Sequence, residues 1–120
     1  MTKQTLAAAL NLAYQLAAQD GFQEEETWVL AQEIKSFNLS EEDEEEVLRL
    51  YRTLTADQAI ELVRNSDEAT KDEVNALMMM AMINDRVIDP NESRAFFRVR
   101  ELCGITREMS IDDARRVLGF

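Results

Sequence analysis

The sequence predicts an all-α fold, and three observations support this prediction. Apolar residues recur with helical spacing in seven segments, capping residues stand at the segment boundaries, and no segment alternates in the way of a half-buried strand. Three glycines and one proline are few, while a hydrophobic content of 46% is enough for a core. We therefore expect residues 1–120 to form a single domain of about seven short helices, a compact globule.

The first three segments have clear boundaries. Residues 2–19 end at the Asp-Gly pair 20–21, since glycine tolerates the left-handed conformation of many helix C-termini. Residues 24–37 begin with glutamates, which the helix dipole favours in a first turn. The third segment begins at Ser40, which with Asp43 resembles a capping box. Its apolar face consists of Val47, Leu48, Leu50, Tyr51 and Leu54.

The last four segments follow the same logic. Thr55 is the expected N-cap of a helix that continues to about residue 63, and a fifth helix is expected over residues 67–84. The sixth segment opens with "DPNE", residues 89–92, in which proline suits the first helical position, and it ends near the glycine at 104. The seventh begins at Ser110 and closes at the Leu-Gly pair 118–119.

Two of the predicted helices are apolar on almost every side. Residues 2–19 contain "LAAALNLAYQLAA", and residues 67–84 contain "VNALMMMAMI". A helix that is hydrophobic all round belongs in the interior. The methionines of the second helix suit irregular gaps in a core, and a methionine-lined groove for a metal or a partner is the alternative.

These two helices lead into similar sequences, which indicates an internal repeat. The first is followed by "AAQDGFQEEE" and the second by "AMINDRVIDPNE". Each unit contains a buried helix, an acidic turn, an amphipathic helix and an exit turn, over about residues 5–40 and 69–106. In this alignment "NLS", residues 38–40, corresponds to "GIT", residues 104–106. If the buried helices pack side by side with pseudo-twofold symmetry, the acidic turns lie near each other.

The two acidic turns resemble those of the TerB-like family, the tellurite-resistance TerB proteins. Asp20, Gly21 and Glu26 match the family's turn in the first copy, which is one residue shorter. Asp85 and Glu92 match in the second copy, together with Ile88, whereas Arg86 replaces the glycine. The resemblance covers about residues 5–118. It implies an all-α fold with a clustered acidic surface that binds divalent cations, a link to metal-oxyanion and stress responses, and no catalytic activity.

The composition restricts the chemistry of any site. The chain has no histidine, which excludes Ser–His–Asp and Cys–His catalysis and histidine-based zinc sites. A metal must then be held by oxygen, which favours Ca²⁺, Mg²⁺ or Mn²⁺. The single cysteine, Cys103, fits a reducing compartment, and we expect it to be a small core residue. No apolar run approaches the roughly 20 residues of a membrane helix, and we expect a cytoplasmic protein.

The net charge of −11 disfavours binding to nucleic acid and favours cations or a protein partner with a basic surface. The block "EEDEEE", residues 41–46, is expected to be a solvated helix start, with a docking face for such a partner as the alternative.

The candidate metal ligands are the acids of the two turns: Asp20, Glu26, Asp85, Asp89 and Glu92. Asp89 and Glu92 have a simple alternative role, because carboxylates at a helix start bond free backbone N–H groups. Asp20 and Asp85 are less easily explained, because the dipole disfavours negative charge at a helix C-terminus. Neither turn fits an EF-hand, since hydrophobic residues occupy the third position of each loop.

The leading hypothesis is a non-enzymatic module that binds a divalent cation through these turns. A helical adaptor domain without a metal is the alternative, and a carboxylate enzyme with a metal-bound water is the third possibility. The sequence offers that enzyme no evident base, nucleophile or phosphate loop.

Overall fold

The computed structural model describes residues 2–17, 38–83 and 90–119, and every regular element in these ranges is a helix. The prediction of an all-α fold is thereby confirmed. The predicted helix at 24–37 lies outside the described residues. The six helices within the described residues are α1 (Lys3–Ala17), α3 (Glu41–Thr53), α4 (Ala56–Arg64), α5 (Glu68–Ile83), α6 (Pro90–Leu102) and α7 (Ile111–Leu118).

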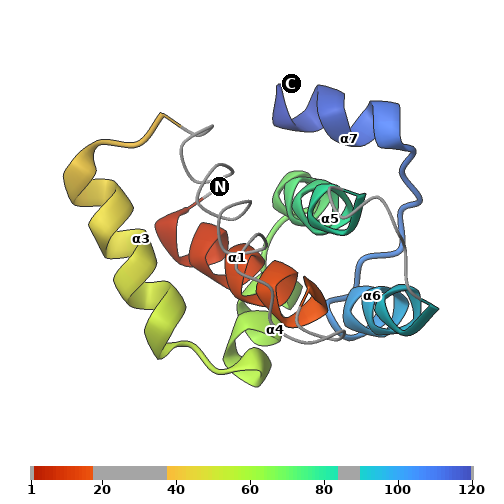
Figure 1. Ribbon diagram of the computed structural model, residues 1–120, viewed down its shortest axis with the longest axis horizontal. Helices are drawn as coiled ribbons and strands as arrows, with labels where there is room; N and C mark the ends of the chain where they lie inside the picture. Colours follow the sequence, from red (N-terminus) through yellow and green to blue (C-terminus); the bar gives the residue numbers. More distant parts are fainter. Residues whose placement is uncertain (1, 18–37, 84–89, 120) are drawn as a thin grey trace.

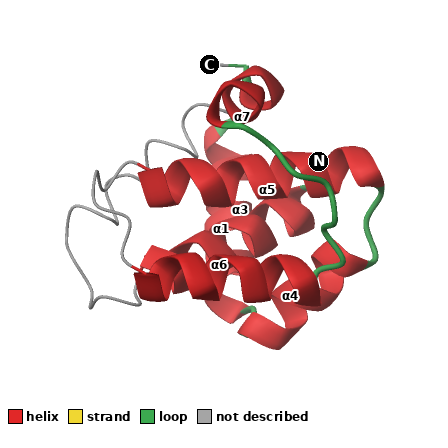
Figure 2. Ribbon diagram, turned by 90° about the vertical axis from the view of Figure 1, so that its right-hand side faces the viewer, coloured by secondary structure: helices red, strands yellow, loops and turns green. Residues whose placement is uncertain are grey.

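The helices are arranged around α1 and α5. α1 contacts α3, α4, α5 and α6, while α5 packs against both α1 and α7. Figure 1 shows the resulting order across the molecule, from α3 through α1 and α5 to α7. Figure 2 shows α6 on an outer face of the molecule, alongside α5. The Cα radius of gyration is 13.0 Å, close to the roughly 13 Å of a compact domain of about 100 residues.

The core is built mainly by α1 and the middle of α5. Eight apolar side chains of α1 are buried: Leu6, Ala7, Ala8, Ala9, Leu10, Leu12, Ala13 and Leu16. α5 contributes Val74, Ala76, Leu77 and Met78, while Met79 is partly buried against the same cluster. This confirms that the two helices with apolar residues on almost every side lie in the interior, where that pattern is stable.

The helix starts predicted from the sequence are confirmed at three positions. Ser40 accepts a hydrogen bond from the backbone N–H of Asp43, with an N–O distance of 3.2 Å. Thr55 and Ser110 form full capping boxes at α4 and α7. α6 begins at Pro90, as the "DPNE" sequence predicts. These ends form where predicted because their hydrogen bonds span only three residues.

Glycine ends α6 and α7, as the sequence also predicts. Gly104 has a φ of 70° and Gly119 a φ of 78°, a conformation that few other residues adopt. After α6, the N–H of Ile105 donates to the carbonyl of Arg100, and the N–H of Gly104 donates to the carbonyl of Glu101. These two bonds make a Schellman motif, which satisfies the last carbonyls of the helix.

The predicted repeat has partial structural support. Asn38 has a φ of 53°, so it shares the left-handed conformation of Gly104, its counterpart in the alignment. The residue after each of them, Leu39 or Ile105, packs on the hydrophobic core. α1 and α5 also pack against each other. The two acidic turns and the helix expected at 24–37 lie outside the described residues, so the repeat as a whole remains a prediction.

Candidate functional site

Four of the five predicted metal ligands lie outside the described residues, and the fifth is described only in its backbone. Asp20, Glu26, Asp85 and Asp89 are outside the described residues. Glu92 belongs to the first turn of α6, but its side chain is also outside the described part. The elements that lead into these residues are described, and they define the framework of the predicted site.

The framework consists of the C-terminal ends of α1 and α5 and the N-terminal end of α6. Figure 1 shows the C-terminal end of α1 close to α6, and these two helices are in contact. Figure 2 shows α5 and α6 side by side. α1 ends at residue 17, before Asp20, and α5 ends at residue 83, before Asp85. The two turns predicted to bind a cation therefore follow two helices that are in contact.

The last turns of the helices differ in charge. α3, α4, α6 and α7 each carry at least one arginine in the last turn, where a cation offsets the negative end of the helix dipole. α1 and α5 carry no basic residue there. The described last turns of the helices that precede Asp20 and Asp85 therefore contain no basic residue that would offset the dipole. Such ends attract a cation and add to the negative potential of any carboxylate nearby.

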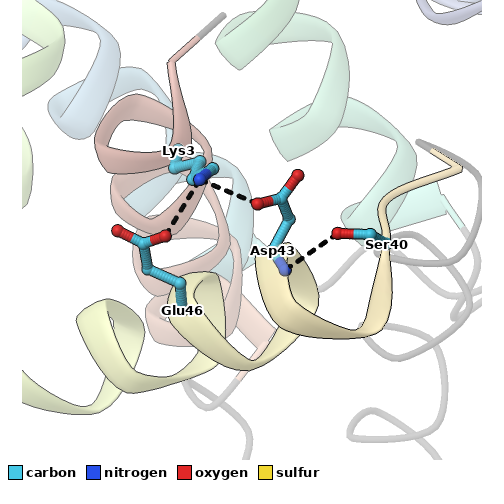
Figure 3. A network of polar contacts seen from close by, with 4 residues as sticks. All are labelled: Lys3, Ser40, Asp43 and Glu46. Carbon is cyan, nitrogen blue, oxygen red and sulfur yellow. Dashed lines mark hydrogen bonds and ion pairs between the residues drawn. The ribbon is translucent and has the colours of Figure 1, made fainter.

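The acidic start of α3 has a different electrostatic environment. Figure 3 shows the Lys3 ammonium of α1 between two carboxylates of α3. Lys3 Nζ lies 2.8 Å from Asp43 Oδ1 and 2.9 Å from Glu46 Oε2. Hydrogen bonds to Asp43 and Glu46 raise the pKa of Lys3 above its usual range. The bond from Lys3, with a smaller contribution from Ser40, lowers the pKa of the Asp43 carboxyl.

This contact explains why α3 begins differently from α4 and α7. In those helices the side chain of the third residue accepts a hydrogen bond from the backbone N–H of the N-cap residue. In α3 the Asp43 carboxylate pairs with Lys3 instead. Two of the six acids in the block 41–46 are thereby paired within the chain. Glu41, Glu42 and Glu45 are exposed, as expected of a solvated helix start.

A second polar cluster joins α5 to the segment before α7. Arg107 Nη1 lies 2.9 Å from Asp72 Oδ2, and Arg100 Nη2 donates to the Arg107 carbonyl at 2.7 Å. These bonds hold the connection between α6 and α7 against α5. A hollow of about 240 Å³ adjoins them, lined by Asp72, Arg107, Glu108, Met109, Asp113, Arg116 and Val117. The opposite charges of this lining are already paired in part, which favours a structural role for the cluster.

Cys103 is a buried core residue, as the sequence predicts. Burial raises the pKa of its thiol to about 11, and the nearby charge of Lys71 only partly opposes this. The thiolate is the nucleophilic form of cysteine, so burial and the raised pKa both disfavour reaction of Cys103 at neutral pH.

Within residues 2–17, 38–83 and 90–119, no group of three or more Cys, Asp or Glu side chains is positioned to hold a metal ion. No helix in these same ranges is long and apolar enough to cross a membrane.

Two buried asparagines were not identified from the sequence as structural residues. Asn11 Nδ2 donates to the Leu54 carbonyl at 3.0 Å, which ties α1 to the junction of α3 and α4. Asn75 in α5 is 1% exposed, and neither polar atom of its side chain has a hydrogen-bond partner within the part of the chain that the structure describes. The sequence contained a signal for them, namely an asparagine within an apolar stretch of helix. Such an asparagine is expected to be buried, and a buried amide requires hydrogen-bond partners.

Comparison with known proteins identifies the fold only. No protein-family model matches the chain, and no curated protein matches it significantly. The structure is similar to the crystal structure of a protein of unknown function from Porphyromonas gingivalis W83, with a TM-score of 0.80 and 24% sequence identity. The alignment covers 100% of this chain and 91% of that chain. The likeness extends over the whole chain and shows a shared all-helical fold.

Proposed function

We propose that the chain is a non-enzymatic cytoplasmic module that binds a divalent cation through the acidic turns after α1 and α5. The observation that carries this proposal is the charge of the last turns. Of the six described helices, α1 and α5 are the two without a basic residue in the last turn, and Asp20 and Asp85 follow them in the sequence within three residues. A cation stabilises two negative helix ends and two carboxylates together.

The chemistry of the chain favours a hard cation. Without histidine, and with its cysteine buried, the chain offers carboxylate, carbonyl and amide oxygens as ligands. Ca²⁺, Mg²⁺ and Mn²⁺ prefer such oxygens. The contact between α1 and α5 supports a site assembled from both turns. In this respect the chain resembles TerB-type tellurite-resistance and stress-response proteins, and we propose a role of that kind.

Thermal unfolding with Ca²⁺, Mg²⁺, Mn²⁺ or a chelator tests the proposal. A cation at 100 times its dissociation constant stabilises the folded state by about 2.7 kcal/mol. We expect one of the three cations to raise the melting temperature of the wild type, and the double variant Asp20→Asn/Asp85→Asn to lose this increase.

The matched control is Glu45→Gln/Glu61→Gln, which also removes two negative charges, but from exposed positions on α3 and α4. It should retain the full cation effect. An absent shift in the wild type, or an equal shift in the Asp20/Asp85 variant, refutes the proposed site.

The alternative function is a helical adaptor that binds a protein without a metal. The observation in its favour is the exposure of Phe97, whose side chain is 61% accessible on the outer face of α6. A melting temperature that no divalent cation changes would favour this alternative.

A further inference from the structure

Two exposed helix faces have charges in opposite order along the chain. The α6 face contains Arg94, Phe97, Arg98, Glu101 and Leu102, all of them exposed. The α3 face contains Glu41, Glu42, Glu45, Arg49 and Arg52, also all exposed. From its N-terminal end, the α6 face is first positive and then negative. The α3 face is first negative and then positive.

We propose that the α6 face of one copy of this chain docks on the α3 face of a second copy, with the two helices parallel. Arg94 and Arg98 are four residues apart, as are Glu41 and Glu45, so the two pairs match turn for turn. In this register Arg49 lies one turn further on, close to Glu101. An antiparallel arrangement places arginine opposite arginine, so charge alone selects the parallel one.

The apolar residues of the two faces support the same arrangement. Phe97 is 61% exposed and Leu102 is 45% exposed. Phe97 is supported from within its own chain: its ring centroid lies 5.6 Å from that of Phe96, and the Arg100 guanidinium lies 6.0 Å from it. A large aromatic side chain that is already ordered costs little further entropy when a partner covers it.

The α3 face has an open hollow that can accept such a side chain. It has a volume of about 690 Å³ and is lined by Glu42, Glu45, Glu46, Leu48, Arg49 and Arg52. Leu48 is partly buried and is the apolar residue among the described residues of this lining. In the parallel register it lies close to Leu102 of the second copy, so the interface combines ion pairs with an apolar contact.

The positions of the two faces favour a second copy as the occupant. α3 and α6 lie on opposite sides of the molecule (Figure 1), so the contact does not form within one chain. The faces differ, so the contact is head to tail, and a pair of copies retains one free α3 face and one free α6 face. An acidic partner in general would pair with Arg94 and Arg98, but it would not supply the positive charge that pairs with Glu101.

Complementary charge variants test this interface. Arg94→Glu/Arg98→Glu makes the α6 face acidic, and Glu41→Arg/Glu45→Arg makes the α3 face basic. Sedimentation velocity up to about 1 mM protein suits the weak association of a small interface. We expect the wild type to associate with rising concentration, and each variant alone to associate at least about tenfold more weakly.

The mixture of the two variants is the decisive sample. The acidic α6 face of the first variant and the basic α3 face of the second are complementary, and so are the two unchanged faces, whereas two copies of the same variant repel. The 1:1 mixture should therefore associate with rising concentration, as the wild type does, with the two variants alternating. Thermal unfolding of each variant confirms that it is folded. A wild type that stays monomeric at all concentrations, or a mixture that associates no better than either variant, overturns the proposal.

Discussion

The two central helices, α1 and α5, have similar compositions but different environments. α1 is buried along most of its length, and both helices contact four others among the described elements. α5 is less uniformly buried over its described side chains, because Glu68 and Ala69 are exposed and Met79 and Met80 are partly accessible. The side-chain N–H group of the buried Asn11 of α1 has a partner, whereas neither polar side-chain atom of the buried Asn75 of α5 has one among the described residues. The comparison shows that α1 organises the core, while α5 connects it to α7.

The largest expected difference concerns apolar packing. Leu10 in α1 is 1% exposed, so Leu10→Ala should reduce the free energy of unfolding by about 3 kcal/mol, from lost burial and the cavity left behind. Met79→Ala in α5 should cost about 1 kcal/mol, because the side chain is only partly buried. Urea unfolding measures both values. Equal losses would contradict the central role assigned to α1.

Substitution of the two buried asparagines should change the free energy of unfolding in opposite directions. Asn11→Ala removes a donor from the Leu54 carbonyl and should destabilise the protein by about 1–2 kcal/mol. Asn75→Ala removes two buried polar atoms that lack partners and should stabilise it by about 1 kcal/mol. The same urea experiments provide the test. A destabilised Asn75→Ala variant would show that this amide is satisfied in solution.

The smallest expected effect concerns the ion pairs of Lys3 in α1 with Asp43 and Glu46 in α3. Lys3→Met removes both ion pairs and should lower the melting temperature slightly at pH 7, whereas Lys3→Arg retains the charge and serves as the control.

The difference between the wild type and Lys3→Met should depend on pH. The pKa of Asp43 is lowered in the folded protein, so its contribution to stability is present above the unfolded value of about 3.9 and is lost as the pH falls through the folded value. The difference should therefore narrow below about pH 4. A constant difference from pH 7 to pH 3 would indicate that the aliphatic part of Lys3, not its charge, supports α1.

The features that the sequence predicted are mostly local. The caps at Ser40, Thr55 and Ser110 and the glycine ends at 104 and 119 depend on residues within one turn, so their patterns are visible in the chain. The burial of α1 and α5 also follows from composition, because an all-round apolar helix is stable only in the interior.

The features that the sequence did not predict depend on distant residues. Lys3 pairs with Glu46, and Asn11 with Leu54, each across 43 positions of the chain. Such contacts require knowledge of which helices are neighbours, and no local pattern contains it. The candidate metal site shares this difficulty, since its formation depends on how two turns 65 residues apart approach each other.

The central claim is that a cation binds beside the ends of α1 and α5 and not at the acidic start of α3. Nuclear magnetic resonance of the ¹⁵N-labelled protein during titration with Mn²⁺ tests it directly, because the paramagnetic ion weakens the signals of nearby amides. The account predicts the earliest losses at Ile83, Asn91 and Glu92, with Glu41 and Glu45 unaffected, and recovery on addition of a chelator. Losses that begin at Glu41 and Glu45, or that spread evenly over the chain, would contradict it.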